Sequence, residues 1–406
     1  HRVTDDRGVY RLYGLPPGTY AVAARAGVYS PRLSPYSDDA PTYYPSAPRD
    51  AATEIVVTSG SEVYGVDIRY RGERGHIVSG AVVGGGELQP YGANVALYSA
   101  ATGGRAGEAY VRPGSNGFAI HGVGDGEYEL VARRWGYNEE EGMVSQPRRI
   151  SVSGADVGGV ELKLEPQASI AGKAVVEQPS KVCEAGREAS IEELVVLLRR
   201  HENAPERRSA YMNSVAGVAL TGAGEFTFRH VDPGRYFIEP RLLVDNWYLK
   251  SIAAAASNTK TPAYAANIAR DGVTLKAGEK LSGVIVTVAD GAASLSGKVV
   301  PAKEGERLPP RVRVHLVPAE ATGADDALRY AEAIADAGGS FALNNVAPGK
   351  YWLVARAAPD AEPGDGPVAR DPDERAKLRR DAEAMKTEVE LKPCQRATGQ
   401  TVKFAR

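Results

Sequence analysis

Short apolar runs alternate with polar residues along most of the chain, and one such pattern occurs four times. Each copy places an aromatic residue ten positions before a tyrosine, at 10 and 20, 118 and 128, 226 and 236, and 341 and 351. The alternation in Phe226-Thr227-Phe228 is typical of a half-buried strand, and the Pro-Gly or Asp-Gly pair before each tyrosine predicts a turn. The pattern therefore predicts four β-hairpins, each with a corner tyrosine that buries its ring and hydrogen-bonds nearby backbone through its hydroxyl.

Further strand patterns surround these hairpins in a constant order. A first strand with an internal glycine is expected at 78–83, 170–175 and 295–300, and a second strand at 94–98, 190–200 and 312–316. Two closing strands are expected at 55–57 and 66–68, 150–152 and 160–162, 273–275 and 284–286, and 389–391 and 402–404. Residues 190–200 also have a helical composition, but their place in the repeat predicts a strand. Residues 372–386 have an amphipathic pattern after a capping Asp371, which predicts one helix in a loop.

This order divides the chain into four β-sandwich repeats, at residues 1–73, 74–165, 166–290 and 291–406, with linkers near 71–76, 165–168 and 289–293. In the last three repeats, the first-strand glycine precedes the aromatic residue by 38, 54 and 44 positions, whereas only nine residues precede Tyr10. The first repeat therefore lacks its first strands, which leaves an open edge and an unfilled core position. Three explanations are open: the preceding segment is cleaved or not shown, another chain donates the strands, or the repeat is partly folded.

Composition narrows the class of protein. A hydrophobic fraction of 43% supports buried cores, and the turns and first strands account for much of the glycine content of 45 residues. A net charge of −2 excludes a strongly basic nucleic-acid binder. No apolar run approaches the roughly 20 residues that a membrane helix needs. We therefore expect no nucleic-acid partner and no membrane span.

No residue pattern points to catalysis. The six histidines are scattered along the sequence, and neither G-x-S-x-G, a P-loop nor G-x-G-x-x-G occurs. Acidic pairs such as Asp38-Asp39 lack the spacing of a dedicated calcium site. We expect no catalytic residue, no cofactor and no metal, and hence a protein that is not an enzyme.

Aromatic side chains are the candidate contact residues. They are Tyr29, Tyr36, Tyr43 and Tyr44 in the first repeat, and Trp135, Tyr137, Trp247 and Tyr248 at the corresponding places of the second and third. Such rings can stack on sugar rings or dock a neighbouring subunit. The alternative is a loop that packs on its own sandwich.

Two cysteines, Cys183 and Cys394, are too few for a disulfide scaffold or a structural zinc site. They either form one disulfide, within or between chains, or remain as free thiols.

The Ser79-Gly80-Ala81-Val82 first strand and the later Pro-Gly-x-Tyr segments resemble the carboxypeptidase regulatory-like domains, also described as transthyretin-like or prealbumin-like. Large secreted bacterial proteins string such domains together, and the resemblance covers nearly the whole chain. It implies an all-β fold of tandem Greek-key, seven-stranded β-sandwiches (Ig-like or transthyretin-like), the first incomplete at its N-terminus. It also implies an extracytoplasmic location and no chemistry of the domain's own.

The expected function is that of a non-enzymatic extracellular structural protein. A rod of tandem sandwiches would form a cell-surface stalk or a subunit of an extracellular fibre, with adhesion as a further role. Head-to-tail self-association, with strand donation completing residues 1–73, and a glycan-binding surface are the expected partnerships. The alternatives are a polysaccharide- or peptide-binding accessory module, or a fragment of a larger secreted enzyme or transporter.

Overall fold

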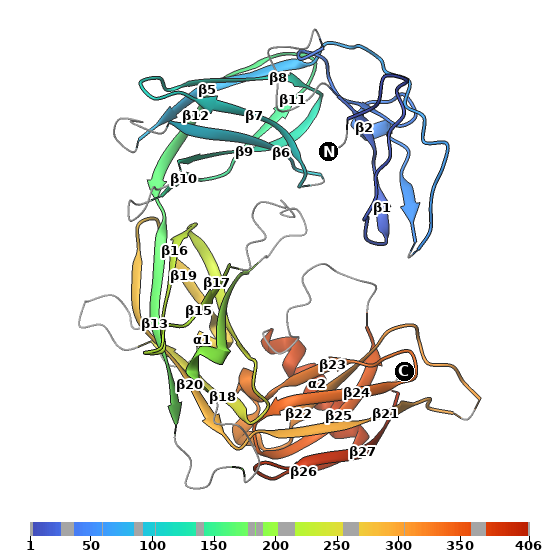
Figure 1. Ribbon diagram of the computed structural model, residues 1–406, viewed down its shortest axis with the longest axis vertical. Helices are drawn as coiled ribbons and strands as arrows, with labels where there is room; N and C mark the ends of the chain where they lie inside the picture. Colours follow the sequence, from blue (N-terminus) through green and yellow to red (C-terminus); the bar gives the residue numbers. More distant parts are fainter. Residues whose placement is uncertain are drawn as a thin grey trace. The chain divides into compact units, whose positions relative to one another are not determined.

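The computed structural model describes residues 3–25, 36–58, 60–84, 92–101, 103–134, 142–177, 183, 190–201, 216–254, 268–303, 305–358 and 371–404. The described residues form two compact units, 3–167 and 168–404. The first unit holds the first two repeats and the second unit holds the last two (Figure 1).

In the second repeat, the described strands form one continuous sheet in the order β7-β6-β9-β10-β12-β5-β8, with β11 paired to β9. Strand β10 pairs with both β9 and β12 and so joins the two layers of the sandwich. The strands are β5 (His76–Val83), β6 (Ala93–Ser99), β7 (Arg105–Val111), β8 (Gly117–Val123), β9 (Gly126–Arg134), β10 (Met143–Ser145), β11 (Arg148–Val152) and β12 (Val157–Pro166).

The third repeat is a sandwich of two four-stranded sheets, β16-β13-β20-β18 and β15-β14-β17-β19. Its elements are β13 (Ala168–Glu177), the 3-10 turn η2 (Ile191–Glu193), β14 (Leu194–Arg200), β15 (Ala216–Ala219), β16 (Glu225–Val231), β17 (Gly234–Leu242), β18 (Trp247–Ala254), α1 (Ile268–Asp271), β19 (Val273–Leu275) and β20 (Lys280–Asp290).

The fourth repeat pairs a three-stranded sheet, β24-β21-β27, with a four-stranded sheet, β23-β22-β25-β26. Its elements are β21 (Ala293–Val300), β22 (Val312–Pro318), the 3-10 turns η3 (Ala321–Gly323) and η4 (Ala327–Arg329), β23 (Ala331–Ile334), β24 (Ser340–Val346), β25 (Gly349–Ala357), α2 (Pro372–Met385), β26 (Glu388–Leu391) and β27 (Arg396–Lys403).

Helix α2 lies where the sequence predicts one helix. The Asp371 side chain accepts hydrogen bonds from the backbone amides of Asp373 and Glu374 and caps its N-terminus, and Lys386 ends it in the left-handed conformation. Its buried residues Leu378 and Ala382 pack on Val317 of β22 and Val354 of β25, outside the sandwich core.

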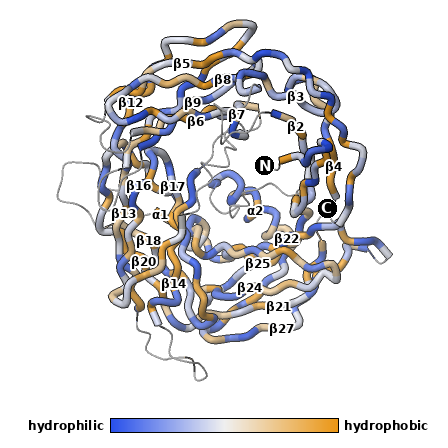
Figure 2. The backbone as a smooth tube through the Cα atoms, turned by 45° about the horizontal axis from the view of Figure 1, so that its top comes forward, coloured by the Kyte–Doolittle hydropathy of each residue, from blue (hydrophilic) through white to orange (hydrophobic). Residues whose placement is uncertain are grey.

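The second, third and fourth repeats place their first strand in the same way. In each, the first strand lies between the strand that contains the aromatic residue (β8, β16 or β24) and the last strand, and it runs parallel to the last strand. Each repeat also buries its own separate apolar core. Apolar and polar positions alternate along the strands, as Figure 2 shows. The fold is all-β, with tandem Greek-key sandwiches that agree with a transthyretin-like or immunoglobulin-like architecture.

The first repeat is much smaller. It contains β1 (Gly18–Tyr20), β2 (Ala23–Ala24), β3 (Thr42–Tyr43), the 3-10 turn η1 (Arg49–Ala51) and β4 (Ile55–Val57). Residues 8–12 and 66–68, which the pattern predicts as strands, form no strand. The reason is that the corresponding segments elsewhere pair with the first strand, which has no counterpart among the described residues here.

The predicted hairpins are wrong in one respect. In the third and fourth repeats, the two arms around the Pro-Gly turn belong to different sheets: β16 pairs with β13, whereas β17 pairs with β14 and β19. The turn therefore crosses from one layer of the sandwich to the other in these repeats. In the second repeat, β8 and β9 lie at different places of the continuous sheet and do not pair with each other. The corner glycines Gly126, Gly234 and Gly349 have φ values of 150, 154 and 153°, a conformation that glycine adopts most readily.

The predicted hydroxyl bond of the corner tyrosine is confirmed in all four repeats, and the predicted burial of its ring is confirmed in the last three, whereas Tyr20 is half-buried. The hydroxyls of Tyr20, Tyr128, Tyr236 and Tyr351 each donate a hydrogen bond of 2.6–2.8 Å to the carbonyl oxygen four residues earlier. The second-strand prediction at 190–200 also holds, except that η2 forms its first turn and β14 follows.

The number of strands differs from seven in two repeats. Eight described strands form in the second and third repeats, and seven form in the fourth. The additional strand of the third repeat is β18, which begins at Trp247 and pairs with β20. The aromatic pair Trp247 and Tyr248, expected on a loop, therefore starts a strand.

Candidate functional site

A pair of tyrosine rings lies at the surface of the first repeat. Tyr36 is 55% exposed and meets Tyr70 edge to face, with 5.9 Å between ring centroids. The Tyr70 hydroxyl donates a 2.9 Å hydrogen bond to Asp39 Oδ2. Burial, followed by this bond and the charge of Asp39, raises the pKa of Tyr70 to about 12. Tyr29, Trp135 and Tyr137 lie outside the described residues.

The rest of the tyrosine-rich segment packs between the first and second repeats. The backbone amide of Gly75 donates to the carbonyl of Asp38, and that of Ala40 donates to the carbonyl of Glu73. A side chain at Gly122, on β8, would lie 2.8 Å from the carbonyl oxygen of Asp39. Residues 37–40 thus pack against the second repeat of the same chain.

Tyr43 and Tyr44 belong to this packing. Tyr43 is half-buried on β3, with the Arg49 guanidinium 5.5 Å above its ring. The Tyr44 amide donates a 2.9 Å hydrogen bond to the carbonyl of Val22. Trp247 is only 4% exposed, within the core of the third repeat. Burial removes its ring from any contact surface, and Tyr248 beside it is half-buried.

The third and fourth repeats meet at a polar junction within the second unit. The Asn345 side chain, at the end of β24, donates hydrogen bonds of 2.5 and 2.8 Å to the carbonyls of Val244 and Trp247. The amides of Gly291 and Ala292, which connect the two repeats, both donate to the carbonyl of Asn246. The connection between the repeats is therefore short and is held by the Asn345 side chain and by backbone hydrogen bonds.

A disulfide spans the same junction. Cys183 follows β13 and Cys394 precedes β27, and their Cα atoms lie 5.6 Å apart across 211 residues of sequence. The amide of Cys394 also donates to the carbonyl of Gly291. The disulfide thus joins the first strand of the third repeat to the last strand of the fourth. The pairing could not be derived from the sequence, because two cysteines so far apart have no local signal.

The described residues of the first repeat contain no counterpart of the first strand of the other repeats. Residues 8–15 and 62–70 correspond to the two strands that flank this first strand elsewhere. The hydroxyl of Tyr10 donates a 2.5 Å hydrogen bond to the carbonyl oxygen of Val66, and Arg11 forms a 2.8 Å ion pair with Glu62. These contacts link the two segments directly. Sequence reasoning indicated the missing strands but not this link.

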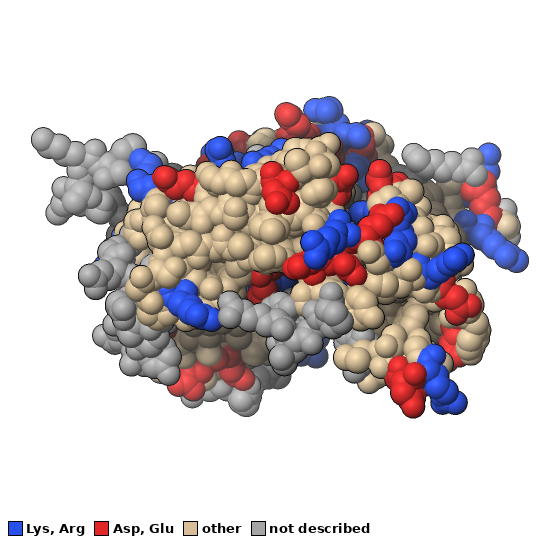
Figure 3. Space-filling model, turned by 90° about the horizontal axis from the view of Figure 1, so that it is seen from above, with Lys and Arg blue, Asp and Glu red and all other residues tan. Residues whose placement is uncertain are grey.

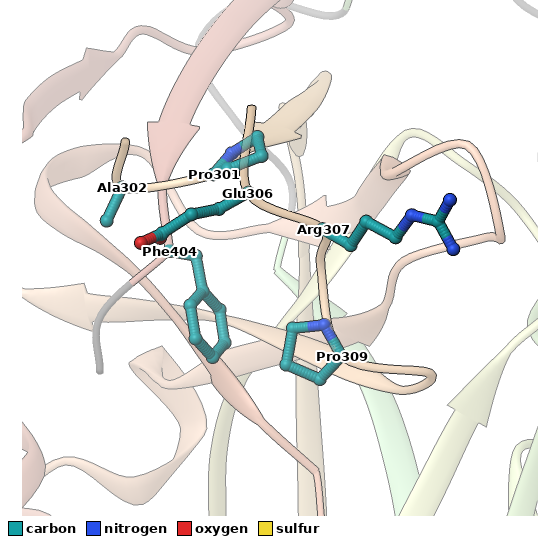
Figure 4. A pocket seen from close by; sticks show the side chains of 6 residues that line it. All are labelled: Pro301, Ala302, Glu306, Arg307, Pro309 and Phe404. Carbon is teal, nitrogen blue, oxygen red and sulfur yellow. The ribbon is translucent and has the colours of Figure 1, made fainter. Parts of the chain in front are cut away.

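A small pocket lies beside the last strand of the fourth repeat (Figure 4). Its volume is about 230 Å³, and the Arg307 side chain extends away from it. Known small-molecule sites have volumes of roughly 300–1,000 Å³. We therefore assign no ligand to it. The lining residues are Pro301, Ala302, Glu306, Arg307, Pro309 and Phe404.

Among the described residues, neither the distribution of charged side chains nor the arrangement of possible metal ligands indicates a further site. Acidic and basic side chains lie next to one another on the face shown in Figure 3. Across the described ranges, no group of three histidine, cysteine or acidic side chains is placed to hold a metal ion. In the same part of the chain, no helix has the length and apolar character to cross a membrane.

Comparisons with known proteins return only distant similarity. No protein-family model matches the chain, and no curated protein matches it. Among solved structures it is similar to the Bacillus anthracis TIE protein, with 13% identity and a TM-score of 0.21 over 97% of this chain and 61% of that one. The chain thus spans about three fifths of that protein's length.

Two pilins are also similar. The Streptococcal ancillary pilin is 10% identical, with a TM-score of 0.19 over 68% of this chain and 88% of that one. BcpA, the major pilin subunit of Bacillus cereus, is 12% identical, with a TM-score of 0.17 over 81% of this chain and 98% of that one. All three TM-scores lie below 0.5, so the function depends on what the chain's own residues support.

Proposed function

We propose that the chain is a load-bearing extracellular structural protein, a segment of a cell-surface stalk or a subunit of an extracellular fibre, with no enzymatic activity. The observation that carries this proposal is the Cys183–Cys394 disulfide. Its position along the chain determines how tension passes through the third and fourth repeats.

Tension on the two ends of the chain enters the third repeat through β13 and leaves the fourth through β27. Cys183 comes after β13, and Cys394 comes before β27. The disulfide therefore connects the arriving strand to the departing strand by covalent bonds. The segment between the two cysteines, which are 211 positions apart, therefore carries no load while the disulfide is intact, and only β13 and β27 of these two sandwiches stay in the tensioned path.

The second repeat resists tension by hydrogen bonds. Its first strand β5 and last strand β12 are parallel neighbours, from the pair Val78 and Val157 to the pair Val83 and Lys163. When such strands are pulled from their outer ends, they slide along each other, and many evenly spaced hydrogen bonds must break together. Strands pulled apart from one end would instead lose their bonds one at a time. This arrangement suits a sandwich that is held under tension.

The disulfide also supports an extracytoplasmic location. Disulfides persist in oxidising surroundings such as the cell exterior and are rare in the cytosol. A pair of sandwiches whose connecting segment is closed by a disulfide is useful to a surface structure that is pulled by flow or by attachment to another cell.

Single-molecule extension of the full chain, held at its two ends, tests this proposal. Without reductant, complete extension should leave the 211-residue loop closed. Adding reductant should lengthen the fully extended chain by roughly 700 Å, because an extended residue spans about 3.3 Å. A Cys183→Ser variant should reach the longer value with and without reductant. Equal lengths of the wild-type chain in both conditions would overturn the proposal.

A second candidate function is glycan binding at Tyr36 and Tyr70. The exposed ring pair and the neighbouring Asp39 carboxylate combine a stacking surface with a hydrogen-bond acceptor. A glycan array should then show binding that Tyr36→Ala abolishes. No binding by the wild-type chain would remove this candidate and leave the load-bearing role untouched.

A further inference from the structure

Two tyrosine phenols that are distant in sequence meet at the surface of the first repeat. Tyr36 and Tyr70 stand 34 positions apart, and their ring centroids lie 5.9 Å apart with an angle of 83° between the ring planes. Their exposed fractions are 55% and 38%, so a dissolved reagent can reach both rings. Exposed side chains change rotamer within nanoseconds. Rotation of the rings can therefore bring a carbon atom of one against a carbon atom of the other.

A carboxylate is placed to take the proton of Tyr70. The Tyr70 hydroxyl donates a 2.9 Å hydrogen bond to Asp39 Oδ2, and the backbone of Asp39 is held in a β-bridge with Arg74. The raised pKa of Tyr70, about 12, keeps the phenol protonated at neutral pH. A phenol loses an electron more readily when its proton passes to a base in the same step, because no cationic radical then forms. A base at hydrogen-bond distance is in reach for such a transfer.

Two other tyrosines show what sets this pair apart. Tyr64 is 81% exposed and donates a hydrogen bond to the Glu62 carboxylate, but among the described residues it has no ring contact. Tyr128 is only 8% exposed, so an oxidant in solution does not reach its ring. The Tyr36–Tyr70 pair combines exposure, a proton acceptor and a second ring.

The first repeat has little buried apolar surface to hold it together. Thr42 is the one buried residue among those that the structure describes in residues 1–73, and the apolar core clusters lie in the other three repeats. Small domains with a weak core are usually stabilised by covalent crosslinks, metals or association. A covalent bond between Tyr36 and Tyr70 would close residues 37–69 into a loop and so supply such a crosslink.

We propose that Tyr36 and Tyr70 form an oxidative crosslinking site, at which a haem peroxidase and hydrogen peroxide join the two rings as dityrosine and Asp39 accepts the Tyr70 proton. The crosslink is a covalent modification of the first repeat that stabilises it. The inference depends on neither the load-bearing role nor glycan binding, so each of the three can fail alone.

The reaction balances with one molecule of peroxide. Each phenol loses one electron and one proton, the Tyr70 proton passing to Asp39 and the Tyr36 proton to water. The two phenoxyl radicals combine through a carbon–carbon bond between ring carbons next to the hydroxyl-bearing carbons. The hydrogen atom on each of these ring carbons then moves to the phenol oxygen, which restores both aromatic rings. Hydrogen peroxide takes up the two electrons and two protons and becomes two molecules of water.

Treatment of the full chain in dilute solution with a haem peroxidase and hydrogen peroxide, followed by digestion and mass spectrometry, tests the proposal. A crosslink between Tyr36 and Tyr70 should appear, with a mass two hydrogen atoms below that of the separate peptides. Tyr36→Phe and Tyr70→Phe should each abolish it. Hydrogen–deuterium exchange of the first repeat should be slower in the crosslinked protein than in the untreated protein.

An Asp39→Asn variant tests the proton acceptor. The asparagine side-chain oxygen can still accept the Tyr70 hydrogen bond but does not take up a proton at neutral pH, so crosslinking should slow about tenfold or more. Coupling of Tyr64 to added N-acetyltyrosine, measured in parallel samples, is the matched control. It should proceed at the same rate in Asp39→Asn and in the wild-type chain, because Tyr64 has its own carboxylate in Glu62.

Three results would overturn the proposal. One is the absence of a Tyr36–Tyr70 crosslink under conditions in which Tyr64 couples to N-acetyltyrosine. Another is crosslinking of Asp39→Asn at the wild-type rate, which would remove the assigned proton acceptor. The third is a crosslink that forms only between chains and in proportion to protein concentration, which would make these rings a site of polymer formation and not of internal stabilisation.

Discussion

The side-chain amide of Asn345 donates a hydrogen bond to the carbonyl oxygen of Trp247, which belongs to the preceding repeat. Asn345 has a positive φ of 57°, and the same place in the other repeats holds Gly14, Gly122 and His230, with φ values of 72, 67 and 56°. Gly122 approaches the backbone of the preceding repeat, as Asn345 does. The residue with this positive φ is thus a point of contact with the preceding repeat: Gly122 in the first unit and Asn345 in the second.

Replacing Asn345 should weaken the junction. Asn345→Ala leaves the carbonyls of Val244 and Trp247 without their donor, at a cost of about 1–3 kcal/mol, and adds strain at a positive φ. Asn345→Gly loses the same hydrogen bonds without the strain and should cost less. Urea unfolding followed by tryptophan fluorescence measures both. An alanine variant as stable as the wild-type chain would contradict the role of this junction.

Removing the disulfide should lower the stability of the second unit. A Cys183→Ser, Cys394→Ser double variant should lose roughly 3–5 kcal/mol of unfolding free energy, because the closed loop is long. Denaturant unfolding of oxidised and reduced protein measures the loss. Reductant should destabilise the wild-type chain and leave the double variant unchanged; a shift in the double variant would point to another target of the reductant.

The hydroxyl group of the corner tyrosine should contribute more to the stability of a complete repeat than to that of the first repeat. Tyr351 is fully buried, and Tyr351→Phe loses its hydroxyl bond to Ala347, at a cost of about 1 kcal/mol. Tyr20 makes the same bond to Pro16 in an exposed setting, so Tyr20→Phe should cost much less. Thermal unfolding measures the loss of stability in each variant. Equal losses in the two variants would contradict a role of burial.

Alkaline pH should destabilise the first unit. Burial raises the pKa of Tyr128 from its ordinary 10.0 to about 12, and the nearby Tyr43 and Asp125 add to the effect. The folded state therefore prefers neutral tyrosine, and this contribution is complete below pH 10 and lost as the pH rises towards 12. Unfolding free energies measured across this interval should fall less steeply for Tyr128→Phe. The same slope in both proteins would contradict this assignment.

The first-strand glycines should not tolerate a side chain. Gly80→Ala places a methyl group against the carbonyl of Val160 and should cost roughly 1–3 kcal/mol or more. Gly158→Ala, on the neighbouring β12, is the matched control, because its methyl group would come no closer than 3.7 Å to Ser79. We expect the control to stay within about 0.5 kcal/mol of the wild-type chain. Denaturant midpoints compare the two, and similar losses would remove the close-approach argument.

The repeat pattern predicts most of the strands, because alternation and turn residues are local signals. It predicts the corner tyrosines for the same reason: the hydroxyl bond reaches only four residues back. It does not show that Phe226 and Tyr236 lie in different sheets, since a strand has the same alternation whichever sheet it joins. Pairing partners are distant in sequence, and they decide between a hairpin and a crossing turn.

The candidate contact residues were harder to predict. Trp247 and Tyr248 share a composition with the surface aromatic segments, yet Trp247 is in the core because β18 pairs with β20 and turns its ring inward. The cysteines lie 211 residues apart, and only the folded junction brings their Cα atoms to 5.6 Å. The deficit of strands in the first repeat was visible from spacing alone, whereas the Tyr10–Val66 bond required the fold.

The parallel pairing of first and last strands has an evolutionary consequence. A chain that enters a sandwich at one end and leaves it at the other is already positioned to begin the next copy. Only Gln167 separates β12 from β13, and only Gly291 and Ala292 separate β20 from β21. A gene with this layout can gain or lose whole copies by in-frame recombination without inventing a new connector. Natural selection can therefore adjust the reach of such a protein by copy number while the sequence of each sandwich diverges on its own.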